Sequence, residues 1–250
     1  MKINVHSSVG RRRTSNQDYA DFFTNKHGQT LMVLCDGVGG HQAGDVASYK
    51  TTEFLGQVFK DQDQALTLAS VQSWMKTAID QVNQYIYQAS KADNQLQGMG
   101  TTLVLASIVE DHLIIGHVGD SRAYIFKNDQ LIRMTEDHSL VNELIKSGEI
   151  TLEEGLSHPQ RNVVTQSIGG TSQVKAEIKV LSVEDIQVVM LCSDGLTNMV
   201  DEMKLLEMFK KDRHDPEFAQ KLIDAANEAG GADNITVIIA TELDYEEVAP

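Results

Sequence analysis

The amino-acid sequence predicts an α+β fold in which antiparallel sheets and helices are stacked as the layers of a sandwich. Strand-like segments come first, then two long helical segments, then many strands, and finally helices and a last strand. Strands and helices do not alternate regularly, which argues against a parallel doubly wound sheet. Asn128-Asp129, between Phe126 and Leu131, is typical of a hairpin tip, so several strands should pair antiparallel.

The expected strands are short segments rich in β-branched or aromatic residues. In chain order they are Tyr19–Thr24, Thr30–Cys35, Thr101–Val109, His112–Val118, Ser121–Lys127, Gln187–Cys192 and Ile235–Thr241. Cys35 and Cys192 each close a hydrophobic stretch, as expected of strands buried inside the molecule. Both should be inert core thiols, and a chain with only two cysteines fits a reducing compartment. No C-x-x-C and no Cys/His spacing suited to zinc occurs in the sequence.

Helices are expected where apolar residues recur at helical spacing. The apolar residues between 47 and 58 share one face, those between 71 and 89 form a longer stripe, and those between 219 and 226 form a third. Such stripes normally face a core. Residues 138–170 differ, because short helical pieces such as Leu140–Lys146 alternate there with polar loop. This long surface segment is of the kind that often carries substrate contacts.

The chain should form one continuous domain over residues 1–250, since it has three prolines, no long linker and no internal repeat. Its net charge of −15, from 36 acidic and 21 basic residues, argues against nucleic acid as a partner. No apolar run approaches the roughly 20 residues needed to cross a bilayer. Residues 1–8 also lack the apolar core of a secretory signal. We therefore expect a cytoplasmic protein without membrane insertion.

Four aspartates lie in similar settings near the ends of expected strands. Asp36 and Asp194 both follow a Leu-Cys stretch and precede glycine, Asp120 follows His-Val-Gly, and Asp233 lies in Gly-Gly-Ala-Asp-Asn before the last strand. A strand end projects a side chain at the rim of a sheet, and an adjacent glycine lets the backbone approach closely. One Asp-Gly pair usually marks only a turn. Four such positions together favour a cluster of carboxylates.

Carboxylates that meet in space repel one another unless cations neutralise them. Oxygen ligands without Cys or His select Mg²⁺ or Mn²⁺ over zinc or copper. Two such ions about 3.5–4 Å apart activate a water and clamp a phosphoryl group. Arg13 lies in a basic run, and its guanidinium matches two phosphate oxygens with a rigid pair of donors. These residues therefore favour a two-metal site that acts on a phosphoryl group.

Eight short motifs carry a resemblance to a known family. They are residues 13–18 (RTSNQD), 35–48 (CDGVGGHQAGDVAS), 100–102 (GTT), 116–122 (GHVGDSR), 137–141 (DHSLV), 160–165 (QRNVVT), 193–197 (SDGLT) and 231–237 (GADNITV). In this order they resemble the metal-dependent protein phosphatases of type 2C, the PPM family, in their compact bacterial form. The motifs span nearly the whole chain, and eight in the family's order are highly specific.

The resemblance implies a four-layer α/β/β/α sandwich, with two antiparallel sheets flanked by helix pairs and metals at one end. It implies two Mn²⁺ or Mg²⁺ ions, with Asp36 bridging both and the Gly37 carbonyl serving one. Asp194 and Asp233 would hold the other ion. Family members often bind a third, looser ion, which here would fall to Asp120 with Asp194.

The resemblance also implies roles for residues around the ions. Arg13 would grip the substrate phosphate, and Asp18 would act mainly through metal-bound water. Residues 138–170 match the variable flap beside the site. The expected reaction is hydrolysis of phosphoserine and phosphothreonine by direct attack of a metal-bridging hydroxide. The expected partners are phosphorylated proteins, among them a serine/threonine kinase that the enzyme opposes and the substrates of that kinase.

The chain departs from the family pattern at one position. Many eukaryotic relatives carry a histidine directly after the metal-binding Asp-Gly, proposed as the acid that protonates the leaving group, and this chain has Val38 there. His41, three residues further on, or a water would then protonate the leaving group. Ser121 lacks the G-x-S-x-G setting of a serine hydrolase, and Walker and dinucleotide glycine patterns are absent.

Two other functions are weighed against this one. A metal-binding pseudophosphatase that serves as a scaffold or sensor would be expected to lack an aspartate ligand, and none is lost here. A specialised phosphatase of stress or sporulation signalling usually carries sensor domains, for which 250 residues leave no room. The sequence therefore favours a free-standing serine/threonine phosphatase.

Overall fold

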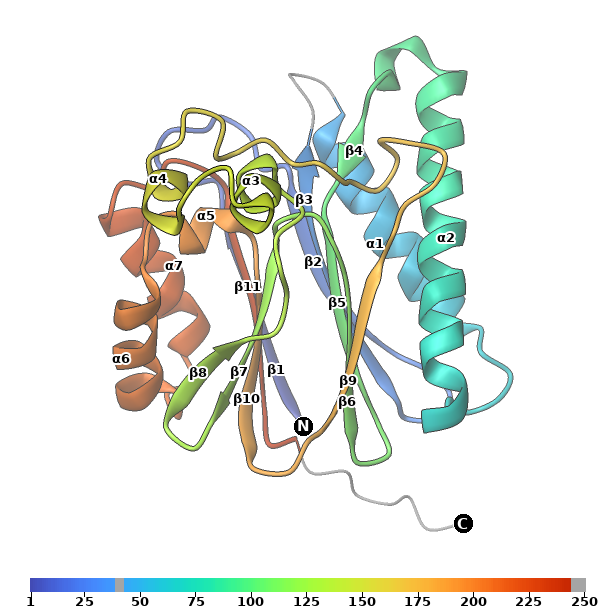
Figure 1. Cartoon of the computed structure of the whole chain (residues 1–250). Coiled ribbons are helices and arrows are strands. Elements are labelled where there is room, and N and C mark those ends of the chain that lie inside the picture. Colours follow the sequence, from blue (N-terminus) through green and yellow to red (C-terminus); the bar gives the residue numbers. More distant parts are fainter. Residues whose placement is uncertain (39–42, 244–250) are drawn as a thin grey trace.

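The computed structural model describes residues 1–38 and 43–243 as two antiparallel sheets packed face to face, with helices on both outer sides (Figure 1). One sheet, in spatial order, consists of β1 (Lys2–Ser8), β11 (Ile235–Thr241), β10 (Ile186–Cys192), β7 (Arg122–Lys127) and β8 (Gln130–Arg133). The other consists of β2 (Asp18–Thr24), β3 (Thr30–Val38), β5 (Leu103–Val109), β6 (His112–Val118) and β9 (Glu177–Ser182), with the short β4 (Gly100–Thr101) paired to β3. The expected α+β sandwich is confirmed.

Helices cover the outer face of each sheet (Figure 1). The pair α1 (Gly44–Lys60) and α2 (Leu68–Ala92) lies on the sheet that contains β3, and the pair α6 (Glu202–Asp212) and α7 (Phe218–Glu228) lies on the other. Shorter elements are η1 (Asn94–Leu96), α3 (Leu140–Ser147), α4 (Leu152–Leu156) and α5 (Asp194–Thr197). None of the helices within residues 1–38 and 43–243 is long and apolar enough to cross a membrane.

The apolar strands are explained by burial on both faces. In β3, Leu31, Val33 and Cys35 pack against the α1–α2 layer. Met32 and Leu34 point the other way, into the core between the sheets. Side chains alternate along a strand, so a strand covered on both faces is a nearly continuous apolar run. The same alternation holds in β10, which explains why both cysteine-ended segments resembled buried strands.

One expected strand is interrupted. The segment Thr101–Val109 is divided at Thr102 into β4 and β5. The Thr102 amide donates to the carbonyl oxygen of Asp36 at 2.8 Å, and its hydroxyl accepts from the amide of Asp36 at 3.0 Å. These bonds fix the backbone of Thr102 against the end of β3.

The elements that the sequence pattern did not predict are β1, β9, η1, α5 and α6, and β8 was indicated only by the hairpin tip at Asn128-Asp129. The three strands lie at sheet edges and are only half-buried, so they lack the apolar runs of the inner strands. In addition, Ser121–Lys127 begins one residue late, at Arg122, and Gln187–Cys192 begins one residue early, at Ile186.

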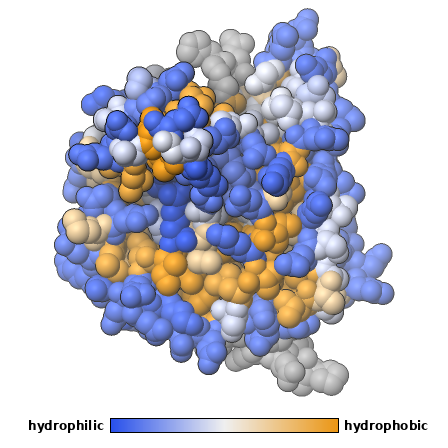
Figure 2. Space-filling view, viewed as in Figure 1, coloured by the Kyte–Doolittle hydropathy of each residue, from blue (hydrophilic) through white to orange (hydrophobic). Residues whose placement is uncertain are grey.

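The segment 138–170 contains the expected short helices, α3 and α4, at the end of the sandwich near α5 (Figure 1). We call residues 138–170 the flap segment. The Thr165 amide donates to the His138 carbonyl at 2.8 Å, and the Ile168 amide donates to the Thr101 carbonyl at 2.8 Å. Leu152 of α4 is 69% exposed, and Figure 2 shows apolar residues within the otherwise hydrophilic surface of this region. The segment is thus fastened at its base and exposed at its tip.

Candidate active site

The site lies where β2 begins and β3 ends, between the two sheets. Asp36 continues the alternation of Met32 and Leu34 and therefore lies on the side of β3 that faces the other sheet. Asp18 is directly opposite Asp36 in the antiparallel register, so its side chain lies on the same side. From the other sheet, the Ser193 hydroxyl donates to Oδ2 of Asp18 at 2.8 Å. The two sheets are thereby joined at the aspartates.

Asp194 and Asp233 reach the same place from the end of β10 and from the loop before β11. Asp194 is the first residue of α5, and the Asn198 side-chain amide donates to its Oδ2 at 2.9 Å. A Cβ on Gly195 would lie 1.9 Å from the carbonyl oxygen of Asn234, so only glycine lets α5 approach the Asp233 loop this closely. The Asp-Gly pair is therefore a packing requirement here as well as a turn.

Asp120 is presented by the turn after β6. Gly119 has a φ of +107°, a backbone conformation that strongly favours glycine. A Cβ at Gly119 would also lie 2.7 Å from Cβ of Thr102. The turn is therefore packed against the residue that interrupts the β4–β5 strand.

These side chains surround a pocket of about 570 Å³. It is lined by Arg12, Arg13, Thr14, Ser15, Gln17, Asp36, Gly37, Val38, Thr102, Asp120, Asn162, Val164, Asp194, Asp233 and Asn234. The flap segment contributes Asn162 and Val164. Of the residues singled out from the sequence, Arg13, Asp36, Gly37, Asp120, Asp194 and Asp233 all face this pocket, and the buried Asp18 lies beside Asp36. His41 lies outside the described residues.

Burial and mutual repulsion raise the pKa values of Asp18, Asp36, Asp120 and Asp194 when no cation is present. Burial raises the pKa of Asp18 to about 7 and that of Asp120 to about 8. Burial, followed by the charges of Asp18 and Asp194, raises the pKa of Asp36 well above its ordinary value. Burial, followed by Asp233, raises the pKa of Asp194. A site with these properties favours positive charge in its centre.

The donor set fits a hard divalent cation. Within the described residues, Oδ1 of Asp18 is buried and has no hydrogen-bond partner. The pocket is lined by the carboxylates of Asp36, Asp120, Asp194 and Asp233, and carboxylate oxygens are ligands that Mg²⁺ and Mn²⁺ prefer. A Cβ on Gly37 would lie 2.5 Å from the Gly44 carbonyl oxygen and 2.8 Å from that of Gln17. The backbone at Gly37 is therefore packed too closely for any side chain.

Arg13 brings a positive charge to the rim of the pocket. Its Nη2 lies 2.7 Å from Oδ2 of Asp233, and its side chain is 52% exposed. The loop is held because the amides of Arg11 and Arg12 donate to the Gly231 carbonyl at 2.8 and 3.2 Å. The guanidinium is accessible to an anion in the pocket and is already oriented by one carboxylate.

Asn234 is a supporting residue that the sequence analysis did not single out. Its Oδ1 accepts from the Gln17 amide at 2.8 Å, and its Nδ2 donates to the carbonyls of Val9 and Ser15 at 2.8 and 2.9 Å. One side chain thereby fixes the loop that carries Arg13. Its position beside Asp233 in the GADN motif was the only feature of the sequence that could have indicated this supporting role.

Arg122 and Asp137 form a second support that was missed. Nη2 of Arg122 lies 2.7 Å from Oδ2 of Asp137, and Nε lies 3.1 Å from Oδ1. Both side chains are mostly buried, and such bidentate pairs are strong and geometrically specific. The pair joins the strand after Asp120 to the residue that precedes the flap segment. Both residues lie in motifs that were recognised in the sequence, Arg122 in GHVGDSR and Asp137 in DHSLV, and these motifs could have indicated the pair.

Comparison with known proteins places this geometry in a family. The family model for protein phosphatase 2C matches residues 7–236. The chain is 40% identical over 239 residues to the serine/threonine phosphatase stp of Listeria monocytogenes, covering 96% of this chain and 95% of that protein.

Solved structures show the same fold. The serine/threonine phosphatase Stp1 from Staphylococcus aureus superimposes with a TM-score of 0.92 at 33% identity, covering 96% of this chain and 94% of that one. The catalytic domain of the protein phosphatase PstP, solved in complex with two manganese ions, superimposes with a TM-score of 0.81 at 29% identity, covering 96% and 97%. The chain therefore belongs to the protein phosphatase 2C family and is a protein-serine/threonine phosphatase.

Proposed function

We propose that this phosphatase depends on two divalent cations, Mn²⁺ or Mg²⁺, held in the aspartate pocket. Asp36 would be shared by both ions, the Gly37 carbonyl would serve one, and Asp194 and Asp233 would hold the other. Asp120, with Asp194, would take a third ion where one binds. The two manganese ions in the PstP complex support this proposal.

The observation that carries the proposal is the burial of several carboxyl groups around one pocket. The pKa of Asp120 is raised to about 8 by burial and then by Asp194, so at neutral pH the metal-free site holds protons in place of cations. When bound, the cations would supply Lewis-acid chemistry, lowering the pKa of a water and offsetting charge on the phosphoryl group.

The protein's own residues would bind and orient the substrate. The half-exposed guanidinium of Arg13 would donate to two phosphoryl oxygens, a geometry that lysine cannot reproduce. Asp18 accepts from Ser193 through Oδ2, which leaves Oδ1 to accept from a water in the pocket. Asn234 and Asp233 would keep the Arg13 loop in place during this step.

The departing serine or threonine oxygen needs a proton. We propose that His41 or a water donates it. The pH dependence of kcat in a His41→Gln variant separates the two, because loss of a histidine donor would remove the limb of the profile that reports its titration.

The proposal extends to the cellular role. Residues 1–250 would act as one catalytic domain, with the flap segment contacting the protein part of the substrate. The substrates would be phosphorylated proteins, including a serine/threonine kinase and the targets of that kinase. We place the enzyme in the cytoplasm, where free thiols such as Cys35 and Cys192 stay reduced.

The decisive experiment measures hydrolysis of phosphoserine and phosphothreonine peptides together with calorimetric Mn²⁺ binding. EDTA should abolish activity, and excess Mn²⁺ or Mg²⁺ should restore it. Asp36→Asn should lose both activity and Mn²⁺ binding. The matched control Asp129→Asn, at an exposed hairpin tip where φ is +58°, should keep both. Full activity after exhaustive chelation, or activity with zinc alone, would show that the proposal is wrong.

A further inference from the structure

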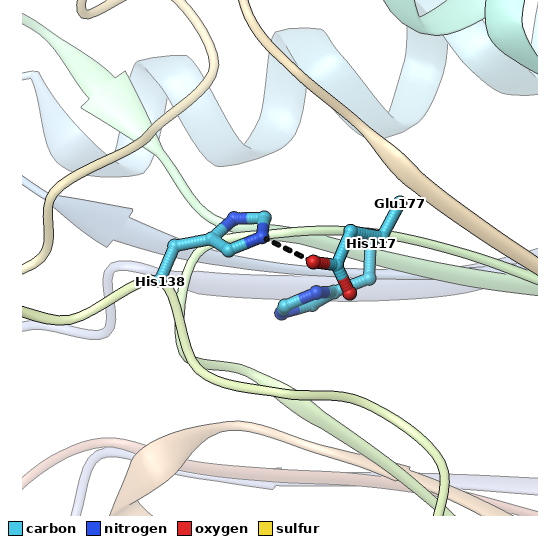
Figure 3. A group of neighbouring side chains, drawn as sticks. All are labelled: His117, His138 and Glu177. Atoms are coloured by element: carbon cyan, nitrogen blue, oxygen red, sulfur yellow. Dashed lines mark ion pairs between the residues drawn. The ribbon is translucent and has the colours of Figure 1, made fainter. Parts of the chain in front are cut away.

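A second group of potential metal ligands lies outside the aspartate pocket. His117, His138 and Glu177 come together so that one candidate ligand atom from each lies within 4.8 Å of the other two (Figure 3). His117 and Glu177 are directly opposite in the β6–β9 register and thus share one face of the sheet. His138 reaches them from the loop after β8. None of the three lines the aspartate pocket.

His117 is the unusual member of this group. It is 1% exposed, and neither ring nitrogen has a hydrogen-bond partner among the residues that the structure describes. A buried polar group without a partner costs about 1–3 kcal/mol, so it calls for a water or an ion. Burial, followed by the nearby His138, lowers the pKa of His117 to about 3. The ring is therefore neutral, which is the form of histidine that binds metals.

The spacing of the other two residues also suits an ion. Nε2 of His138 lies 3.6 Å from Oε1 of Glu177, longer than an ordinary N–H···O hydrogen bond of about 2.7–3.2 Å. Two ligand atoms of a tetrahedral zinc ion, each about 2.0–2.1 Å from it, lie roughly 3.3–3.4 Å apart. The ring centroids of His117 and His138 are 4.7 Å apart, and two histidines with one glutamate are a ligand set that zinc takes in enzymes.

We propose that His117, His138 and Glu177 bind a divalent transition-metal ion of the zinc class, with the fourth position open to water. This site is separate from the aspartate pocket and has a different donor chemistry. His138 and Glu177 lie on either side of residues 139–176, and His117 is fixed in the inner strand β6. An ion bound here ties the start of the flap segment, at His138, to β6 and β9 of the sheet.

Binding of the ion has a cost at His138. The Gly119 amide donates to Nδ1 of His138 at 3.1 Å, so the neutral ring carries its proton on Nε2. Coordination through Nε2 moves that proton to Nδ1, and the Gly119 amide then loses its acceptor. Gly119 precedes Asp120 in a turn with φ of +107°. Occupation of the zinc-class site is therefore coupled to the turn that presents Asp120 to the pocket.

The test uses the full chain with Mg²⁺ in excess, so that the aspartate pocket is occupied by a hard cation. Zn²⁺ is titrated calorimetrically. Co²⁺ is titrated by visible absorption, which distinguishes tetrahedral coordination with nitrogen ligands from octahedral coordination by oxygen. We expect one tightly bound Zn²⁺ or Co²⁺ ion per chain. His138→Gln and Glu177→Gln should each weaken this binding beyond the about 10- to 100-fold that loss of an outer-shell partner costs.

Two controls make the result specific. His112→Gln removes a histidine at the other end of β6, which pairs with Asp111 at 2.6 Å, and it should leave the binding of this ion intact. Asp36→Asn disables the aspartate pocket and should also leave the tight binding of one Zn²⁺ or Co²⁺ ion unchanged, so this test does not depend on the proposed function. Zn²⁺ should further protect residues 139–176 from limited proteolysis in the wild type and not in Glu177→Gln.

Several outcomes would overturn the proposal. Absence of a tightly bound Zn²⁺ or Co²⁺ ion would mean that a water satisfies His117. Equal binding by wild type, His138→Gln and Glu177→Gln would show that the ion binds elsewhere on the protein. Glu177 is 38% exposed, so Glu177→Gln should fold normally, and a thermal melt checks this for each variant.

Discussion

Replacing Arg13 by alanine should slow the phosphatase without weakening its metal binding. The side chain offers one charge-assisted contact to the phosphate, worth about 1.5–3 kcal/mol. That corresponds to a fall of about 10- to 200-fold in kcat/KM. Part of the loss should appear in KM, because the guanidinium also binds the phosphate of the ground state.

The effect of this substitution on metal affinity follows from the ion pair with Asp233. Nη2 of Arg13 lies 2.7 Å from Oδ2 of Asp233, and the two side chains are 52% and 35% exposed. Exposed pairs of this kind are worth about 0.2–1 kcal/mol. Removing the arginine frees the carboxylate for a cation, so the Kd for Mn²⁺ should stay unchanged or fall by up to about fivefold.

The assay combines calorimetric Mn²⁺ titration with steady-state kinetics on a phosphopeptide and on p-nitrophenyl phosphate. Arg12→Ala is the matched control, because Arg12 lines the same pocket but makes no ion pair within the described part of the chain. It should change activity by no more than about twofold. Arg13→Lys should recover only part of the loss, since a point charge replaces a planar fork. Tenfold weaker Mn²⁺ binding by Arg13→Ala, or unchanged kinetics, would refute the reasoning.

Three further predictions concern the thiols, the flap segment and the aspartates. Cys35 and Cys192 are buried, and burial raises the pKa of each thiol to about 12. The double alanine variant should therefore lose stability but keep the kcat of its folded fraction, and a selective fall in kcat would indicate thiol chemistry. Substitutions within 139–167 should alter preference among phosphoproteins more than turnover of p-nitrophenyl phosphate, and equal losses on both would show that the segment supports the pocket. Because the folded-state pKa values of Asp18 and Asp120 are raised to about 7 and 8, the metal-free protein should lose stability as pH rises from about 4 to 8. Thermal melts should show this loss of stability, and Mn²⁺ should reverse it at pH 8. A metal-free protein that is more stable at pH 8 than at pH 5 would contradict the predicted direction of the pH dependence.

The inner strands and the edge strand β2 could be predicted from the sequence, whereas the ranges of the other edge strands, β1, β8 and β9, could not. β3 and β10 are covered by helices on one face and by the second sheet on the other, so both sets of alternating side chains are apolar. β1, β8 and β9 lie at edges and alternate only between half-buried and exposed positions. The periodicity that identifies a strand is therefore weakest where one side of the sheet is open.

The aspartates of the pocket could be singled out for a similar reason. Asp36 and Asp194 each come after an apolar run that closes with Leu-Cys, so their position near a strand end was visible in the sequence. Asn234 was not visible in this way, because its importance lies in bonds to Val9, Ser15 and Gln17, more than 200 residues away. A local pattern indicates where a strand ends and not which loop will lie across it.

The group of His117, His138 and Glu177 shows the same limit most clearly. A histidine inside an apolar strand gives no sign of a ligand role, and Glu177 lies in an edge strand that the sequence pattern does not indicate. Only the pairing of β6 with β9 puts His117 opposite Glu177, and only the hydrogen bond to Gly119 fixes the ring of His138 beside them. The three residues are 21 and 39 positions apart along the chain (117 to 138, and 138 to 177), so no ligand-spacing rule applies to them. A site of this kind depends on strand register, which has to be known before the residues can be recognised as neighbours.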